Sequence, residues 1–497
     1  MENIFSGIKL RQLCLVGLLV LSTVVYAQNN QHVNDAQKAT LISLKGNWRF
    51  KLDSSGTGVG AKWFNLNLDE NIMLPGTTDE AKKGDKTTNR ETGRLTRVYQ
   101  YYGAAWYQHE VAIPQNWNGK HISFLMERTK LTTVWIDSLL VGSQNTLTGK
   151  QLYDLTKLLT PGKHTITIVV NNQDKPPIGD PHQISDGTQT NWNGILGKIE
   201  LQAYDAVWMN DVKLYPDVKN KLVKATIKFG NLQNLPANGT ITISAKTWNS
   251  KKNSTVPAKK FDCVADSTNE VTIVFPLGND IQTWDEFNPA LYKFTISFSG
   301  KNSKGSYTDT KEISTGIRDF TSKGTQFNIN GKTIFLRGKH DACVFPLTGY
   351  APMTVDGWVK VFRISKSYGI NHYRFHTWCP PEAAFAAADI MGIYMQPELP
   401  IWGSIGKQGE VRVGDVEQRT DNDPLAQRTA YLMGEGRHIF HDYGNYASFV
   451  MFALGNELGG SREVMADMVS QFSALDNRHL FAQGSNNFLS SPQYSQR

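Results

Sequence analysis

From residue 318 onward, segments with the pattern of strands alternate with segments that have the pattern of helices. The strand-like segments are rich in β-branched and aromatic residues, and the segments between them space their apolar residues as helices do. Two helical segments end at Gly369 and Gly392, and two begin at Pro381 and Ser461, which are typical helix boundaries. Such alternation predicts a parallel sheet with right-handed crossovers, because each helix returns the chain to the edge where strands begin.

Five strands and four helices are predicted in this part of the chain. The strands are expected at residues 333–341, 372–378, 393–402, 449–457 and 479–487. The helices are expected at residues 357–369, 381–392, 426–444 and 461–476. The apolar spacing of the first helix predicts a face made of Val359, Phe362, Ile364 and Tyr368. The pattern alone allows a Rossmann sheet or a β/α barrel, but no G-x-G-x-x-G follows the first strand, which argues against dinucleotide binding.

Before residue 318 the sequence is strand-like, with polar and glycine turns. Short strand-like segments lie at residues 106–114, 121–127, 132–142 and 164–172. Many short strands at this spacing predict a sandwich or jelly roll between residues 44 and 204. Further strand-like segments between residues 206 and 317 fit the size of one immunoglobulin-like sandwich.

The N-terminal residues have the pattern of a secretory signal peptide. Lys9 and Arg11 provide the positive region, residues 13–25 provide the apolar region, and Ala27 completes a small-x-small cleavage site. We therefore expect an exported protein, periplasmic or secreted, whose mature chain begins near Gln28. An uncleaved membrane anchor is the alternative, although the apolar stretch is short for crossing a bilayer.

These patterns divide the chain into four parts. They are a signal peptide at 1–27, a jelly-roll domain at 28–205, an immunoglobulin-like β-sandwich at 206–317 and a β/α domain at 318–497. The predicted fold class is therefore multidomain, with β domains followed by an α/β domain.

Charge and cysteine patterns narrow the function classes. The formal net charge is +7, but the sequence has no dense Lys/Arg block, no glycine-rich phosphate loop and no zinc-type Cys/His spacing. This argues against nucleic acid as a partner, and no stretch after the signal peptide is apolar enough to span a membrane. The mature chain keeps Cys263, Cys343 and Cys379, an odd number that excludes a complete disulfide framework. Whether Cys343 pairs with Cys379, which follows the neighbouring strand, is left open.

Polar and aromatic side chains follow every predicted strand of the β/α domain. In strand order they are Arg337, His340 and Asp341; Arg374, His376 and Trp378; Glu398 and Trp402; Asn456 and Glu457; and Gln483, Ser485 and Asn486. In a β/α barrel the active site collects at these strand ends. A carboxylic acid beside an amide, with hydroxyl-binding groups and tryptophans around them, suits glycoside hydrolysis. For any single residue, a satisfied buried polar group is the alternative.

Several segments carry a specific resemblance to known enzymes. They are residues 101–124, 132–142, 190–201, 327–341 and 369–398, together with the Gly-Asn-Glu run at 455–457. In this order they resemble glycoside hydrolase family 2, the group of β-galactosidases, β-glucuronidases and β-mannosidases. The resemblance covers nearly the whole mature chain and implies a jelly-roll sugar-binding domain, an immunoglobulin-like sandwich and a (β/α)8 TIM barrel.

The resemblance also implies roles for individual residues in a retaining, exo-acting β-glycosidase. Glu457 would be the general acid/base, and Asn456 would donate to the substrate 2-hydroxyl. Arg374 would support the catalytic carboxylates. The substrate-binding residues would be Arg374, His340, Asp341, His376, Trp378, Glu398 and Trp402, with a structural salt bridge as the alternative role for Glu398. The run from Phe375 to Pro380 departs from the family's usual Ser-His-Tyr-Pro, which leaves the equivalence of His376 open by one position.

The barrel is incomplete in this sequence. A TIM barrel needs eight strands, and we predict about five. The family's nucleophile follows strand seven, so no nucleophile is assigned in this chain, and we expect a truncated product or fragment without hydrolytic activity of its own. The partner would be an oligosaccharide or polysaccharide, and the alternative is a non-catalytic carbohydrate-binding protein or a decayed fragment.

The sequence leaves several properties of the site open. No metal or other cofactor is evident, although some family members use magnesium or sodium. The sugar is not identified, because the family sets its specificity in loops after strands six to eight. The oligomeric state is also undetermined.

Overall fold

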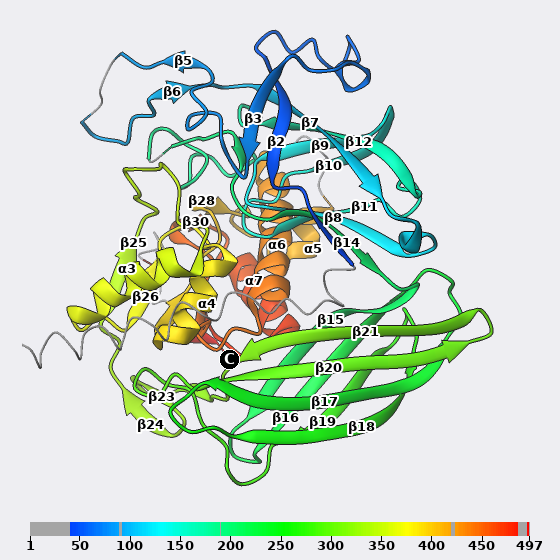
Figure 1. The fold of residues 1–497 in the computed structure, drawn as a ribbon. Helices are drawn as coiled ribbons and strands as arrows, with labels where there is room; N and C mark the ends of the chain where they lie inside the picture. The colour runs from blue at the N-terminus through cyan, green and yellow to red at the C-terminus, as the bar shows by residue number, and fades with distance from the viewer. Residues whose placement is uncertain (1–39, 89–91, 189, 419–422, 486–494, 497) are drawn as a thin grey trace, which may run out of the picture. The chain divides into compact units, whose positions relative to one another are not determined.

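The computed structural model describes residues 40–88, 92–188, 190–418, 423–485 and 495–496 (Figure 1). The expected signal peptide and Asn486 lie outside the described residues. The chain divides into two compact units, residues 1–42 and 43–497, and the second unit contains the three folded domains. No helix among the described residues is both long and apolar enough to cross a membrane.

The first part of this unit contains two antiparallel sheets. The larger sheet has the strand order β10-β9-β12-β7-β2-β3, and the smaller contains β14-β8-β11. The bounds are β2 Gly46–Asp53, β3 Glu70–Leu74, β7 Ala104–Ile113, β8 His121–Glu127, β9 Leu131–Ile136, β10 Leu139–Gln144, β11 Lys150–Asp154, β12 Gly162–Asn171 and β14 Ile199–Tyr204. Large aromatic side chains such as Trp48, Trp106 and Phe124 are fully buried. This is the predicted jelly-roll domain.

Short elements lie at the edges and loops of this domain. They are β4 Gly76–Thr77, β5 Asp85–Lys86, β6 Tyr99–Gln100, β13 Gly194–Ile195 and the 3-10 turns Trp63–Asn65 and Gln115–Trp117, while β1 Leu41–Ser43 spans the boundary between the two units. A long loop between β12 and β13 carries residues 172–193, and it becomes important at the functional site.

The second part is a sandwich of seven strands. One sheet has the order β15-β16-β19 and the other β18-β17-β20-β21. The bounds are β15 Val207–Asp217, β16 Leu222–Asn231, β17 Ala237–Asn249, β18 Thr255–Ala265, β19 Glu270–Pro276, β20 Leu291–Asn302 and β21 Gly305–Thr315. Alternate residues such as Ile241 and Ile243, or Phe294 and Ile296, are buried, because successive side chains of a strand point to opposite faces. This is the immunoglobulin-like sandwich that the strand-like segments and the size of this part predict.

The third part begins with a small antiparallel sheet of β22 Phe320–Lys323, β23 Gln326–Ile329 and β24 Lys332–Ile334. Five short parallel strands follow in chain order: β25 Gly338–Asp341, β26 His372–Phe375, β27 Tyr394–Gln396, β29 Met451–Ala453 and β31 Leu480–Ala482. Parallel ladders join β25 to β26, β26 to β27 and β29 to β31, and a parallel bridge between Met395 and Phe449 joins the two groups. The prediction of five parallel strands is confirmed.

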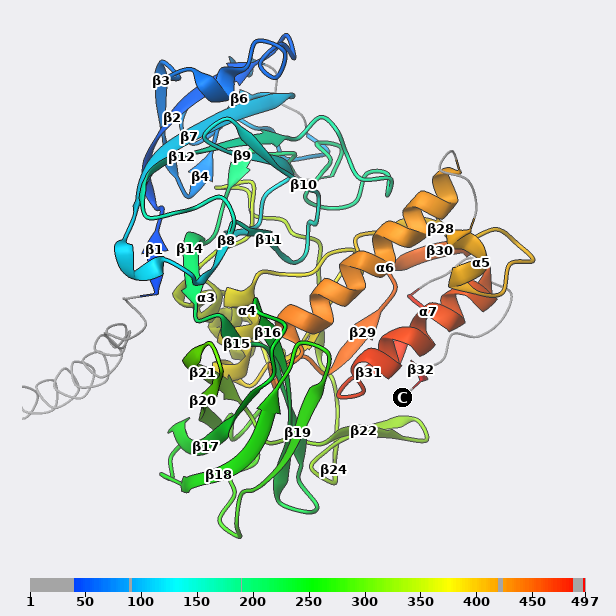
Figure 2. The same cartoon turned by 90° about the vertical axis from the view of Figure 1, so that its right-hand side faces the viewer.

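Helices separate these strands as the alternation predicted (Figure 2). They are α3 Val355–Ser367, α4 Glu382–Met391, α5 Val413–Glu417, α6 Pro424–Tyr443 and α7 Arg462–Leu475. Beyond the sheet, β28 Trp402–Ile405 and β30 Asn456–Gly460 form a separate parallel pair. β32 Ser495–Gln496 lies antiparallel to β31. In the part of the chain that the structure describes, the barrel is not closed.

Several local predictions differ from the structure. The strands expected at 333–341 and 449–457 are each two strands, because residues 335–337 separate β24 from β25 and residues 454–455 separate β29 from β30. In α3 the buried side chains are Trp358 and Phe362, while Ile364 is 53% and Tyr368 82% exposed. At about 100° per residue, Ile364 and Tyr368 lie about 200° and 240° around the helix from Phe362, so they point away from the sheet.

Buried polar contacts join the domains inside this unit. The carboxylate of Glu435 on α6 accepts hydrogen bonds from the backbone amides of Leu147 and Thr148 in the jelly-roll domain. The guanidinium of Arg128 donates to the carbonyl oxygens of Leu147 and Pro380. Separating the two domains would leave these buried polar groups without partners, which is costly. The contacts therefore hold the loops of the first domain against the β/α domain.

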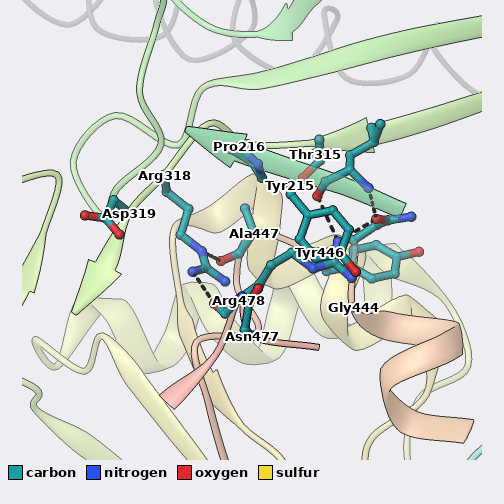
Figure 3. A pocket seen from close by; sticks show the side chains of 13 residues that line it. Tyr215, Pro216, Thr315, Arg318, Asp319, Gly444, Tyr446, Ala447, Asn477 and Arg478 are labelled. Atoms are coloured by element: carbon teal, nitrogen blue, oxygen red, sulfur yellow. Dashed lines mark hydrogen bonds between the residues drawn. The ribbon is translucent and has the colours of Figure 1, made fainter. Parts of the chain in front are cut away.

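A second contact surrounds a cavity of about 260 Å³ between the sandwich and the β/α domain (Figure 3). Arg318 donates to the carbonyl oxygens of Ala447, Phe449 and Arg478. Arg478 in turn donates to the carbonyl oxygen of Leu214 on β15 and to the side chain of Asn445. Both arginines therefore donate to groups of the protein itself. The cavity lies at a structural contact between the sandwich and the β/α domain.

Candidate active site

Three neighbouring strand ends meet at the guanidinium of Arg374. Its Nε donates to Oε1 of Glu398 at 2.7 Å, and its Nη2 lies 3.4 Å from Oε2 of the same carboxylate. The same Nη2 donates to Oδ1 of Asn456 at 2.8 Å. Arg374 lies on β26, Glu398 follows β27 and Asn456 begins β30. The planar fork of arginine suits this arrangement, because it presents several donors in fixed directions.

Glu398 is closed off from solvent by the protein, with no exposed surface. Its Oε2 also accepts from the backbone amide of Thr377 at 2.9 Å. Burial raises the pKa of the Glu398 carboxyl, and the ion pair with Arg374 opposes that rise. The alternative role given to this residue, a structural salt bridge, is the geometry observed. Glu398 therefore holds Arg374 in place, and its contact with substrate stays a prediction.

The Gly455-Asn456-Glu457 segment makes a sharp change of direction at the end of its strand. Gly455 has φ of +143°, and a Cβ placed there would lie 2.4 Å from the carbonyl oxygen of Ile401, so only glycine fits. Glu457 has φ of +52°, a left-handed conformation that costs a non-glycine residue about 1–3 kcal/mol and is concentrated at functional sites. Its amide donates to the carbonyl oxygen of Ser485 at 2.9 Å.

This turn gives the two neighbours different surroundings. Asn456 is 7% exposed and faces Arg374, whereas Glu457 is only partly buried. Because Oδ1 of Asn456 accepts from Arg374, the NH₂ end of its amide is the end that can donate to a ligand. The arrangement thus presents a fixed donor beside a carboxyl group.

A cluster of aromatic rings lies beside Arg374 on the same strand ends. The rings of His340 and His376 are 4.6 Å apart, edge to face, and His376 stacks near Trp402 at 6.0 Å. Nδ1 of His376 also hydrogen-bonds to Nε2 of His182 at 3.0 Å. Sequence reasoning missed His182, because it lies in the long β12–β13 loop of the first domain and nothing local to that loop indicates the contact.

His340 and His376 are held in the uncharged form at these strand ends. Burial, with smaller effects of His182, His340 and Arg374, lowers the pKa of His376 to about 4. Burial, followed by the charge of Arg374, lowers the pKa of His340. At neutral pH these rings act as hydrogen-bonding groups and not as cations.

The other predicted site residues have structural contacts. Asp341 is 5% exposed; its carboxylate pairs with Lys339 at 3.0 Å and accepts from the amide of Cys343. Trp378 is fully buried in the core, and its indole N–H donates to the backbone oxygen of Asp341 at 2.9 Å. This differs from the expectation that Trp378 forms a wall of the sugar site, because its ring packs among the aromatic residues beneath the strand ends.

The cysteine pairing that the sequence left open is not present. Cys263, Cys343 and Cys379 are all free thiols, and the last two are fully buried. Burial raises the pKa of both buried thiols to about 12. Since the thiolate is the reactive form, we expect iodoacetamide at pH 8 to leave Cys343 and Cys379 unmodified in the folded protein and to modify both in denaturant. Peptide mass mapping would measure this, and rapid modification of either in the native state would contradict it.

Within the described residues, no group of three or more His, Cys, Asp or Glu side chains is arranged to hold a metal ion.

Comparison with known protein families covers most of residues 41–491. Residues 41–204 match the family described as "Glycosyl hydrolases family 2, sugar binding domain", residues 207–318 match "Glycosyl hydrolases family 2", and residues 320–491 match "Glycosyl hydrolases family 2, TIM barrel domain". The three matches follow the order of the three parts of the fold.

Individual relatives are distant but extensive. The chain is 23% identical over 443 residues to a β-glucuronidase of Paenibacillus borealis, covering 85% of this chain and 68% of that protein. It is 22% identical over 462 residues to a β-galactosidase of Oenococcus oeni, covering 87% of this chain and 41% of the relative. It is 24% identical over 397 residues to a β-galactosidase of Thermoanaerobacterium thermosulfurigenes, covering 76% of this chain and 51% of the relative. The chain thus spans between about two fifths and two thirds of the length of these relatives.

Solved structures have the same fold. A β-glucuronidase from an uncultured Clostridium species superposes with a TM-score of 0.67 at 20% identity, covering 90% of this chain and 73% of that one. A β-glycosidase from Bacteroides vulgatus superposes with a TM-score of 0.68 at 18% identity, covering 90% and 54%. Together with the matches along all three domains, these findings show that the chain belongs to family 2 of the glycosyl hydrolases.

Proposed function

We propose that this chain supplies the acid/base side of the active site of a β-glycosidase that removes terminal β-linked sugars. Relatives from the same family are named β-glucuronidase and β-galactosidase, and they support a carbohydrate substrate. We also propose, from the N-terminal sequence pattern, that the protein is exported. The sugar itself is not part of the proposal.

The observation that carries the proposal is the shared guanidinium of Arg374. Arg374 orients the amide of Asn456 through a 2.8 Å hydrogen bond, and the buried Glu398 holds Arg374 in place. Glu457 follows Asn456 directly in the chain. A positioned donor next to a carboxyl group can hold a sugar hydroxyl while the carboxyl protonates the glycosidic oxygen, as this chemistry requires.

The mechanism divides the work between two carboxyl groups. Glu457 would give its proton to the departing oxygen and afterwards remove a proton from water, as the acid/base of a retaining enzyme does. Asn456 would donate to a hydroxyl whose hydrogen bond strengthens in the transition state. The second carboxyl attacks the anomeric carbon in such enzymes. The resemblance places it after strand seven, beyond the five parallel strands that the described residues form.

The test measures hydrolysis of methyl and p-nitrophenyl β-galactosides and β-glucuronides by the full-length gene product. In Glu457→Gln we expect the rate on a methyl glycoside to fall about 10²–10⁴-fold, the usual contribution of a general acid. The p-nitrophenyl glycoside should lose less in the bond-breaking step, because its leaving group needs little protonation. Glu463→Gln, on the exposed first turn of α7, is the matched control. Equal rates in wild type and Glu457→Gln would contradict the proposal, and sugar binding without any cleavage would favour a binding protein.

A further inference from the structure

His182 reaches the candidate active site from a different domain. It lies in the β12–β13 loop of the jelly-roll domain and is 6% exposed. Its Nε2 is 3.0 Å from Nδ1 of His376, which follows β26 of the β/α domain. The edge of its ring also faces Trp402 at 5.2 Å. The two imidazoles therefore form a side-chain contact between the two domains at the strand ends of the candidate site.

The loop that carries His182 is held by buried polar contacts. The Asn172 amide donates to the backbone oxygens of Tyr101 and Asn191. The Asp186 carboxylate accepts from the amide of Asn191 at 2.7 Å and pairs with Arg97 at 3.1 Å. These contacts lie on both sides of His182 in the sequence, so they fix its position relative to the first domain.

The loop is also held beside His182 itself. The ammonium group of Lys130 donates to the backbone oxygen of Gln183 and lies 4.0 Å from the ring centre of Trp192. Lys130 is 2% exposed. A histidine on a loop held in this way has a defined position, whereas a mobile surface side chain does not.

A hydrogen bond between two imidazole nitrogens ties the proton of one ring to the role of the other. Of the two facing nitrogens, one must donate and the other must accept. If Nδ1 of His376 accepts, its Nε2 carries the proton and is a donor; if Nδ1 donates, Nε2 is an acceptor. A lone neutral histidine can exchange between these forms, whereas a partner on Nδ1 selects one of them.

The surroundings favour a neutral His376. The charged and titratable groups around His376 are His182 from the loop, His340 from β25 and Arg374 from β26. Each of these groups lowers the pKa of His376, after the larger effect of burial. A proton added to His376 at low pH would make Nδ1 a donor, so Nε2 of His182 could then only accept.

We propose that His182 is a positioning residue of the candidate sugar site, which fixes the ring and the proton of His376 so that Nε2 meets a substrate hydroxyl in one defined role. The role toward sugar rests on the proposed function above. The ligand chemistry is a neutral hydroxyl group, because an uncharged imidazole recognises hydroxyls through a single directional hydrogen bond.

The first test follows the His376 ring by NMR in the 497-residue chain labelled with ¹³C and ¹⁵N histidine, with His376→Gln identifying the signal. Wild type should show one dominant tautomer and an acidic pKa. In His182→Ala the pKa of His376 should rise by about one unit or more, because a desolvating and repelling neighbour is gone. His182→Gln, which keeps a hydrogen-bonding side chain, should restore the single tautomer. Lys175→Gln, in the same loop and exposed, should change neither property.

The second test adds methyl β-D-galactopyranoside, β-D-glucuronide or β-D-mannopyranoside to the same samples. Wild type should bind one of them, and His182→Ala should bind it about fivefold more weakly, the net value of one neutral hydrogen bond. An unchanged tautomer and pKa in both His182 variants would overturn the inference, as would equal sugar binding by wild type and His182→Ala. If no sugar binds to wild type, the proposed function fails at this site, while the NMR result still decides whether His182 controls His376.

Discussion

Replacing Arg374 by methionine should lower the free energy of unfolding by about 3–5 kcal/mol at neutral pH, the usual cost of removing one partner from a buried ion pair. The variant would leave the Glu398 carboxylate without its cation, at a position with no exposed surface. Asn456 would lose the donor that orients its amide. Sugar binding should be lost together with stability, because one guanidinium would no longer connect the ends of the three strands.

Chemical denaturation followed by tryptophan fluorescence would measure this effect at several pH values. Glu398 already has a raised pKa from burial, and without Arg374 its pKa should rise further. The unpaired carboxylate can then take a proton, so the loss should be largest at alkaline pH and smaller below pH ~5. The double variant Arg374→Met/Glu398→Gln should recover part of the stability, because it removes the unpaired charge.

Arg363→Met is the matched control, since Arg363 lies on the exposed side of α3 and exposed substitutions usually change stability by less than about 0.5 kcal/mol. A change of that small size in Arg374→Met would contradict the role given to Arg374. So would a double variant that is less stable than Arg374→Met at every pH.

Replacing Asp476 by asparagine should be comparably destabilising, at about 3–5 kcal/mol at pH 7. The Asp476 side chain is fully buried and pairs with Arg478, which is itself nearly buried. Arg478 also donates to the backbone oxygen of Leu214 on β15 and to Asn445 (Figure 3). The variant would therefore weaken the junction between the sandwich and the β/α domain as well as the ion pair.

This ion pair gives a defined dependence of stability on pH. Burial alone would raise the pKa of Asp476, but the charge and hydrogen bonds of Arg478 outweigh it and hold the pKa well below its ordinary value. A lowered folded-state pKa contributes stability that is fully present above the unfolded value of about 4 and is lost as the pH falls further. Unfolding at pH 3 and pH 7 should therefore differ less in Asp476→Asn than in wild type.

Asp467→Asn, on the partly exposed face of α7, serves as the control for the change of an acidic residue. If wild type and Asp476→Asn lose the same free energy of unfolding between pH 7 and pH 3, Asp476 contributes nothing to the loss of stability in acid.

The order of the domains and the five parallel strands could be predicted because both depend on local patterns. Two-residue alternation in β17 and β20, and helical spacing in α4 and α7, are each set by which residues must face the core. The placement of Arg374 and Asn456 at strand ends followed from the same patterns, since parallel strands present their carboxyl ends at one edge.

The failures lie where a side chain's environment depends on distant residues. Trp378 and Glu398 follow strands, as the sequence indicated, but residues of other elements bury both completely. Ile364 and Tyr368 were placed on the wrong face of α3, because a short helix with scattered apolar residues allows more than one face. His182 gave no signal, since its partner His376 is 194 residues away in the chain.

By itself the sequence determined which elements form, in which order, and which polar residues end the strands, because these depend on neighbours a few positions apart in the chain. Only the tertiary structure decided which of those residues contact solvent, which are held by ion pairs, and which loop of the first domain contacts the strand ends of the β/α domain. Burial and pairing are set by groups that are distant in the chain, as Arg374 with Glu398 shows, or that come from separate domains, as His182 with His376 shows.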